Sequence, residues 1–278
     1  MIIDADVHLS LTERNGITAD QALRKMDRAN VDMANIWLQP PYMRDIESAN
    51  RYIFEAARLH PDRFYATGWV DPHYGEEAAM DMLKRCTQDY GMRSVKMNGA
   101  QNSFYIDDES CFPLYAYLNS NRCALAFHIG ADFYDFTHPT RAQKVAKAFP
   151  DLRILLVHMG GAGLPNLSNA CIEVAQQCPN TILVGSAVSY VSIAQAIKVL
   201  GPARVCFGSD EPFAYMHVER AAYDAFLPDI TDHAGYALVM GGNIARFFEI
   251  SARPCEKNGP LTTPLKEEAD KFTLDGTM

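Results

Sequence analysis

The sequence predicts a single-domain α/β protein with the architecture of a (β/α)8 TIM barrel. Eight short aliphatic runs alternate with helix-like stretches, which is the order of strands and helices in such a barrel. The length of 278 residues also suits it, because these barrels typically take about 250 residues. An open doubly wound sheet is the alternative, but the one Gly cluster, "MGGAGLPN", lacks the third Gly of the phosphate-binding turn typical of that fold.

The expected strands and helices follow one another in pairs. Residues 1–8 ("MIIDADVH") have the pattern of a buried strand, and residues 18–30 that of an amphipathic helix with Thr18 as its N-cap. The further expected strands are residues 33–39, 63–70, 92–98, 123–130, 152–160, 180–187 and 204–210. The clearest further helices are residues 47–60, 75–91 and 140–150. Residues 1–250 therefore form the expected barrel, and the polar residues 251–278 form a C-terminal extension on its surface.

Composition excludes several classes of function. The net charge is −9, the isoelectric point is about 5.3 and no basic run occurs, which argues against binding to nucleic acid or to an anionic membrane. No apolar stretch reaches the roughly 18 residues of a membrane span, and the beginning of the chain lacks the pattern of a signal peptide. The seven Cys residues are scattered, without a C-x-x-C pair, as expected for free thiols in the cytoplasm.

Polar residues mark the ends of five expected strands, where a barrel of this kind builds its active site. Each has an ordinary structural explanation, because a His that ends a strand usually belongs to the core and an Asp there often caps a helix. Burying so many polar groups at one level would cost several kcal/mol without a shared purpose. One divalent metal explains Asp6, His8, His128, His158 and Asp210 together, with Zn²⁺ as the first candidate and Mn²⁺ or Fe²⁺ as competitors. The full set of polar residues at these strand ends is Asp6, His8, Lys96, Asn98, His128, His158 and Asp210.

Several motifs together resemble the amidohydrolase superfamily, in the branch that contains aminocarboxymuconate-semialdehyde decarboxylase. The segments "IIDADVH", "AFHIG", "LLVHMGGAG" and "RVCFGSDEPF" are similar to the family's motifs on the first, fifth, sixth and eighth strands. The segments "LHPDRFYATGWVDP" and "GGNIARFFEI" match its framework. The resemblance covers nearly all of residues 1–250 and implies the same barrel fold.

The resemblance also implies roles for individual residues. It implies that Asp6, His8, His128 and Asp210 bind one divalent metal, and that His158 is the catalytic His beside that metal. Asp6 stands where the first His of the family motif usually is. A carboxylate at this position makes the site harder and favours Mn²⁺ more than an all-His set does.

Two reactions are expected from such a site, and hydrolysis is the first. A divalent metal lowers the pKa of a water molecule, Asp210 accepts its proton, and His158 helps to polarise the carbonyl of an ester, lactone or amide. The alternative is non-oxidative decarboxylation of an aromatic or enoic carboxylic acid, in which His158 handles the proton. The short loop "LSLTERNGI" at residues 9–17 favours hydrolysis, because such decarboxylases usually carry a long insertion there and carboxylate-binding arginines. Arg14 is the sole arginine of this loop, and Arg44 lies in the loop after the second expected strand. A catalytically inactive barrel that only binds a ligand is a third class.

Further polar and aromatic residues at the expected strand exits are predicted to contact a small-molecule substrate. Lys96 has three open roles, as a bridging metal ligand, as a contact for a substrate anion, or as a structural residue. A homodimer is compatible with the resemblance, because a neighbouring subunit can complete the carboxylate-binding cradle of such decarboxylases. The predicted substrate-binding residues are Lys96, Trp69, His73, Asn98, His138 and Arg44.

Overall fold

The computed structural model describes residues 1–250 except 15, 41–44, 131 and 162–164. Its strands are β1 Ile3–Leu9, β2 Met33–Leu38, β3 Phe64–Ala66, β4 Gly68–Trp69, β5 Ser94–Met97, β6 Ala124–His128, β7 Ile154–Val157, β8 Thr181–Val184 and β9 Val205–Cys206. Its α-helices are α1 Ala19–Ala29, α2 Ile46–Leu59, α3 Glu76–Lys84, α4 Gly99–Asn102, α5 Phe112–Ser120, α6 Pro139–Ala148, α7 Pro165–Gln177, α8 Tyr190–Leu200, α9 Met216–Phe226, α10 His233–Ala237 and α11 Asn243–Phe248. The expected extension at residues 251–278 lies outside the described residues.

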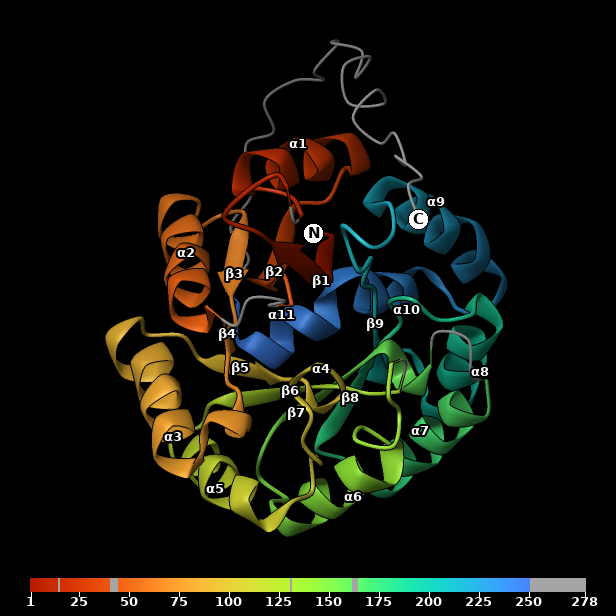
Figure 1. The fold of residues 1–278 in the computed structure, drawn as a ribbon. Coiled ribbons are helices and arrows are strands. Elements are labelled where there is room, and N and C mark those ends of the chain that lie inside the picture. The colour runs from red at the N-terminus through yellow and green to blue at the C-terminus, as the bar shows by residue number, and fades with distance from the viewer. Residues whose placement is uncertain (15, 41–44, 131, 162–164, 251–278) are drawn as a thin grey trace, which may run out of the picture.

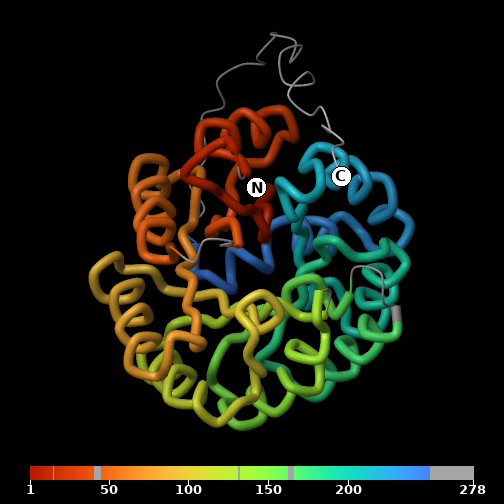
Figure 2. Tube along the Cα trace, viewed as in Figure 1, coloured from red at the N-terminus to blue at the C-terminus, as the bar shows by residue number. Residues whose placement is uncertain are grey.

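The strands form the predicted barrel, surrounded by helices (Figure 1). All adjacent strands are parallel, in the order β1-β2-β3 and β4 to β9. The last strand returns to the first, since the Asp210 amide donates to the Asp6 carbonyl at 2.9 Å and the His8 amide donates to the Glu211 carbonyl at 2.8 Å. The chain colours therefore follow one another around the ring from the N-terminus onward (Figure 2).

Changes of backbone direction or of pairing partner cut short or break three of the expected strands. The run 63–70 changes partner at Thr67, so that β3 pairs with β2 and β4 pairs with β5. The run 152–160 ends at Val157, because His158 takes a left-handed φ of 67° that a strand cannot continue. The run 204–210 ends at Cys206, well before Asp210, whose φ is 62°. Local strand patterns do not reveal where the backbone turns in this way.

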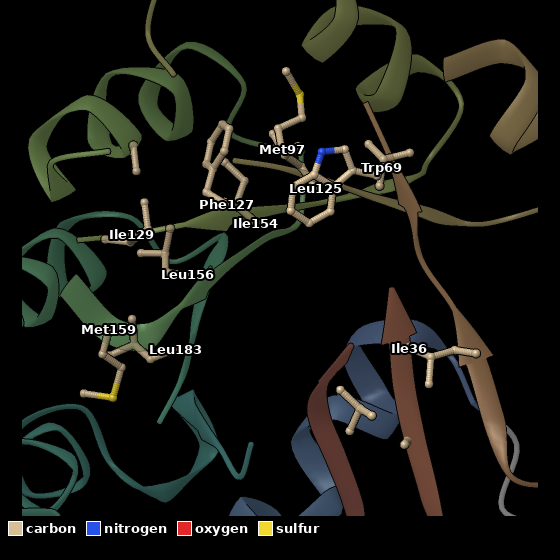
Figure 3. Close-up of a cluster of buried hydrophobic side chains, with 14 of the residues drawn as sticks. Ile36, Trp69, Met97, Leu125, Phe127, Ile129, Ile154, Leu156, Met159 and Leu183 are labelled. Carbon is tan, nitrogen blue, oxygen red and sulfur yellow. The ribbon is translucent and has the colours of Figure 1, made fainter. Parts of the chain in front are cut away.

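Alternate side chains of the strands divide the core into two layers. An outer layer packs between strands and helices, and Figure 3 shows Leu125 and Phe127 of β6 beside Ile154 and Leu156 of β7 in it. An inner layer fills the barrel with alternate residues of β1, β2, β6, β7, β8 and β9, together with residues of α11. Since side chains alternate along a strand, His128 shares the inner face of β6 with Ala124 and Ala126.

The first strand changes its alternation inside the barrel. Its register against β2 shifts between Asp4 and Val7, which is the mark of a β-bulge. Before the shift Ala5 belongs to the inner layer, and after it Val7 belongs to the outer layer. The shift therefore sends Asp6 and His8 together toward the barrel interior.

Among the described residues, no helix combines the length and apolar character needed to cross a bilayer.

Candidate active site

Asp6, His8 and Asp210 meet at the carboxyl ends of the strands. His8 Nε2 lies 3.4 Å from Asp6 Oδ1 and 3.6 Å from Asp210 Oδ1. One ligand atom from each residue lies within 4.8 Å of the other two, and all three residues are buried. Residues from both ends of the chain are thus brought together with the spacing that one cation requires.

Backbone contacts hold these side chains in place. His8 Nδ1 lies 2.8 Å from the Leu38 carbonyl oxygen, which only accepts hydrogen bonds, so Nδ1 carries the proton and Nε2 keeps its lone pair. A backbone partner of this kind is typical of His residues that bind a metal. Asp210 keeps its left-handed conformation because its amide bonds to Asp6 and its carbonyl accepts from Phe213 at 2.7 Å. Sparsely populated backbone conformations of this kind cluster at active sites.

Two further His residues lie at the carboxyl ends of neighbouring strands. The rings of His128 on β6 and His158 after β7 meet edge to face, with centroids 4.6 Å apart. Ser186, which the sequence interpretation missed, donates a hydrogen bond to Asp6 Oδ2 at 2.5 Å and lies 3.1 Å from His158 Nδ1. The signal for Ser186 was its position at the end of the run 180–187, one of the expected strand exits. His158 is therefore linked to Asp6 through Ser186.

Lys96 is a fully buried cation beside these groups. Its Nζ lies 3.6 Å from Asp6 Oδ1 and 3.7 Å from the ring centroid of Trp37, with Trp69 farther away at 5.8 Å. No hydrogen-bond partner of Nζ occurs in the described part of the chain. The N–H groups of the Lys96 ammonium are therefore available to donate hydrogen bonds to a ligand.

Burial shifts the pKa values of the whole cluster. Burial alone would raise the pKa of Asp6, but Lys96 and the neighbouring imidazoles hold it well below its usual range. The pKa of Asp210 is raised well above its usual range by burial and by the charge of Asp6. Burial lowers the pKa of Lys96, against the opposing effects of Asp6 and Asp210. It also lowers the pKa of His158 to about 4.

The ligand atoms fit a divalent cation. His8 Nε2 lies 3.4 Å from Asp6 Oδ1, and Asp6 Oδ1 has no hydrogen-bond partner among the described residues. His128, the fourth expected ligand, is not among the three residues whose ligand atoms lie within 4.8 Å of one another. Its Nε2 is buried without a hydrogen-bond partner among the described residues, and burial holds the pKa of His128 well below its usual value, so the imidazole is neutral as metal binding requires. Mixed imidazole and carboxylate donors suit Zn²⁺ or Mn²⁺.

The other predicted substrate-binding residues have structural contacts of their own. Trp69 is buried and its Nε1 donates to Asn102 Oδ1 at 3.0 Å. Asn98 accepts from the Gln101 amide at the start of α4, and His138 occupies the N-cap of α6. His73 is exposed on the turn after β4, and Arg44 lies outside the described residues. A role of these residues in substrate binding stays a prediction.

The metal ligands can be tested without a substrate. We expect the purified protein to bind about one equivalent of Mn²⁺ or Zn²⁺, and His128→Ala to lose most of that metal, because it removes a neutral imidazole from the set. Metal content measured by mass spectrometry after dialysis checks this. His138→Ala, which removes an imidazole from the start of α6, is the control and should keep the metal. Full metal content in His128→Ala would exclude His128 as a ligand.

His158 is expected to act beside the metal and not to bind it. His158→Asn should keep the metal, because the four expected ligands Asp6, His8, His128 and Asp210 all remain, and should lower kcat by about 10²–10⁴-fold, as is typical of a positioned acid–base group. Metal content and steady-state rates of the same preparation separate the two effects. Loss of the metal in this variant would show that His158 is a ligand.

Comparison with known proteins supports the fold and the family. Residues 3–250 match the model of the family described as Amidohydrolase. A 5-carboxyvanillate decarboxylase from Sphingomonas paucimobilis is 21% identical, and the match covers 90% of this chain and 99% of that chain with a TM-score of 0.72. The strand and helix order predicted from the sequence is therefore confirmed.

Two further solved structures are similar in fold. A dihydroxybenzoic acid decarboxylase from Polaromonas sp. JS666, with bound manganese and the inhibitor 2-nitroresorcinol, is 17% identical over 89% of this chain and 96% of that chain, with a TM-score of 0.71. A 4-oxalomesaconate hydratase from Rhodopseudomonas palustris is 18% identical over 90% of this chain and 96% of that chain, with a TM-score of 0.70.

Proposed function

Because this chain belongs to the amidohydrolase family, we propose that it is a metal-dependent, non-oxidative decarboxylase of an aromatic or enoic carboxylic acid. The observation that carries this proposal is the buried Lys96 ammonium group, which lies 3.6 Å from Asp6 Oδ1 and lacks a hydrogen-bond partner in the described structure. A decarboxylase needs a cation that holds the substrate carboxylate. The two decarboxylases of similar fold support the same conclusion, since both act on aromatic acids.

This proposal reverses the order of the two reactions expected from the sequence. The short loop at residues 9–17 favoured hydrolysis, and the expected carboxylate-binding cations were arginines in the loops. Arg14 is exposed in this loop, and Arg44 lies outside the described residues. The cation that the structure places beside Asp6 is Lys96. A short loop at residues 9–17 is therefore compatible with decarboxylation, because β5 supplies the cation from within the barrel.

In the proposed decarboxylation, each residue of the candidate site has a separate role. The C–C bond to the carboxylate breaks, its electron pair stays on the substrate carbon, CO₂ leaves, and a proton takes its place. When bound by Asp6, His8, His128 and Asp210, a divalent metal would stabilise negative charge on substrate oxygens. Asp210 Oδ1 faces His8 Nε2, which leaves Oδ2 to carry the proton. Lys96 holds the substrate anion. His158, which Ser186 links to Asp6, is the second acid–base group of the site.

Hydrolysis is the second candidate, and the exposure of Asp210 favours it. The Asp210 side chain is 11% exposed, whereas that of Asp6 is completely buried. Asp210 is therefore the carboxylate of the set that water reaches, and it can accept a proton from an attacking water molecule.

One assay separates the two candidates. The purified protein is loaded with Mn²⁺ and given hydroxylated aromatic acids, enoic acids, lactones and esters, with release of CO₂ and of hydrolysis products measured in parallel. We expect CO₂ from an acid and loss of that activity after treatment with a chelator. Turnover of lactones or esters without any CO₂ release would instead establish hydrolysis.

A further inference from the structure

Trp37 makes two contacts inside the candidate site. Its Nε1 donates a hydrogen bond to His8 Nε2 at 3.1 Å, and the face of its ring lies 3.7 Å from Lys96 Nζ. The side chain is fully buried on β2, next to the strand that carries His8. Trp37 therefore contacts a candidate metal ligand and the buried cation at once.

The contact with His8 uses the atom that a metal would need. A neutral imidazole has one nitrogen that donates and one that accepts, and the accepting nitrogen has a single lone pair. In His8 the proton lies on Nδ1, which faces the Leu38 carbonyl, so Trp37 occupies the lone pair of Nε2. A cation that binds His8 must break this hydrogen bond, whereas Asp6 Oδ1 has no such partner in the described structure.

This competition affects metals unequally. Zn²⁺ draws much of its binding energy from imidazole nitrogen, whereas Mn²⁺ is well served by carboxylate oxygen. The Asp6 and Asp210 oxygens are available without breaking the bond between Trp37 and His8. We infer that Trp37 sets the metal preference of this site, by weakening the binding of Zn²⁺ more than that of Mn²⁺. The inference rests on the proposed function only in that a divalent metal binds here.

The test compares two substitutions of the same kind in the full-length chain. Trp37→Phe removes the indole N–H and keeps an aromatic face toward Lys96, and Trp69→Phe is the matched control because the Trp69 N–H bonds to Asn102. Dissociation constants for Zn²⁺ alone and Mn²⁺ alone are measured by competition with a chelating dye. A hydrogen bond of about 0.5–1.5 kcal/mol predicts that Trp37→Phe binds Zn²⁺ about two- to tenfold more tightly. Its affinity for Mn²⁺ should change less.

Trp69→Phe should leave the ratio of the two dissociation constants unchanged. An unchanged or weaker affinity of Trp37→Phe for Zn²⁺, an equal gain for both metals, or no metal binding by any variant would overturn the inference. These measurements use no substrate, so a protein that shows the expected metal preference but releases no CO₂ would contradict the proposed function alone.

A second measurement does not depend on the folding of Trp37→Phe. The chain has two Trp residues, so the wild-type protein labelled with ¹⁵N at tryptophan has two indole N–H signals in an NMR spectrum. Zn²⁺ should shift the Trp37 signal and speed its hydrogen exchange, because the bond to His8 is broken. The Trp69 signal, assigned by its absence in Trp69→Phe, should change less. A Trp37 signal that stays unchanged at saturating Zn²⁺ would refute the inference.

Discussion

Replacing Asp210 with Asn should lower the rate of CO₂ release by about 10²–10⁴-fold, even at saturating Mn²⁺. An amide keeps an oxygen that faces His8 but cannot carry a proton to the substrate carbon. The Asp210 side chain is 11% exposed, whereas that of Asp6 is completely buried, so Asp210 is the carboxylate of the set that can take up a proton and pass it on. Steady-state rates at a series of Mn²⁺ concentrations separate this effect from weaker metal binding.

Asp132→Asn is the control for this substitution. Asp132 is exposed on the loop after β6, and its charge also acts on Asp210. The Asp132→Asn substitution removes one negative charge near the site without changing a candidate ligand. The rate of CO₂ release by this variant should therefore stay within about twofold of the wild type, as expected for a screened surface charge. If Asp210→Asn retained the wild-type rate when loaded with metal, Asp210 would not carry the proton.

Replacing Lys96 with Met should lower kcat/KM for the acid substrate by about 10²-fold, in the range found for removal of one partner of a buried charge pair. Met has a similar length and stays compatible with the face of Trp37, but it cannot hold a carboxylate. Metal binding should persist, because the substitution removes a positive charge 3.6 Å from Asp6 Oδ1. Metal content and kcat/KM of the same preparation check both parts.

Lys144→Met is the matched control for this prediction. The Lys144 side chain is 54% exposed and its Nζ lies 3.6 Å from Asp107, an interaction of little energetic value at the surface. This variant should keep the wild-type kcat/KM. An unchanged kcat/KM in Lys96→Met would show that Lys96 does not bind the substrate, and would remove the main support for decarboxylation.

Much of the fold follows from local patterns. The helix over residues 18–30 was predicted from its spacing and from Thr18, and α1 indeed begins after Thr18, which accepts from the Gln21 amide. The alternation of strands and helices is a local property, since each pattern spans only a few residues. The ends of the strands before His158 and Asp210 were not predicted, because a positive φ in a non-glycine residue is imposed by tertiary contacts.

The candidate site was predicted in part. The spacing of Asp6 and His8 placed them on one side of a strand, and the structure brings both to Asp210. The β-bulge that sends them inward could not be predicted, because it arises from the pairing of β1 with β2. Ser186 was also missed, since an isolated Ser at the end of a strand has no pattern that distinguishes it from a core residue.

The sequence by itself determined the family, the order of strands and helices, and the residue types at the strand exits, because these depend on local spacing. Only the tertiary structure decided which of those residues meet. It placed Lys96 of β5 beside Asp6 of β1, and Trp37 of β2 against the accepting nitrogen of His8. The physical reason is that hydrogen bonds and charges act over a few ångströms through space, between strands that lie far apart along the chain. In a buried site these contacts set the pKa values and the free lone pairs on which the chemistry depends.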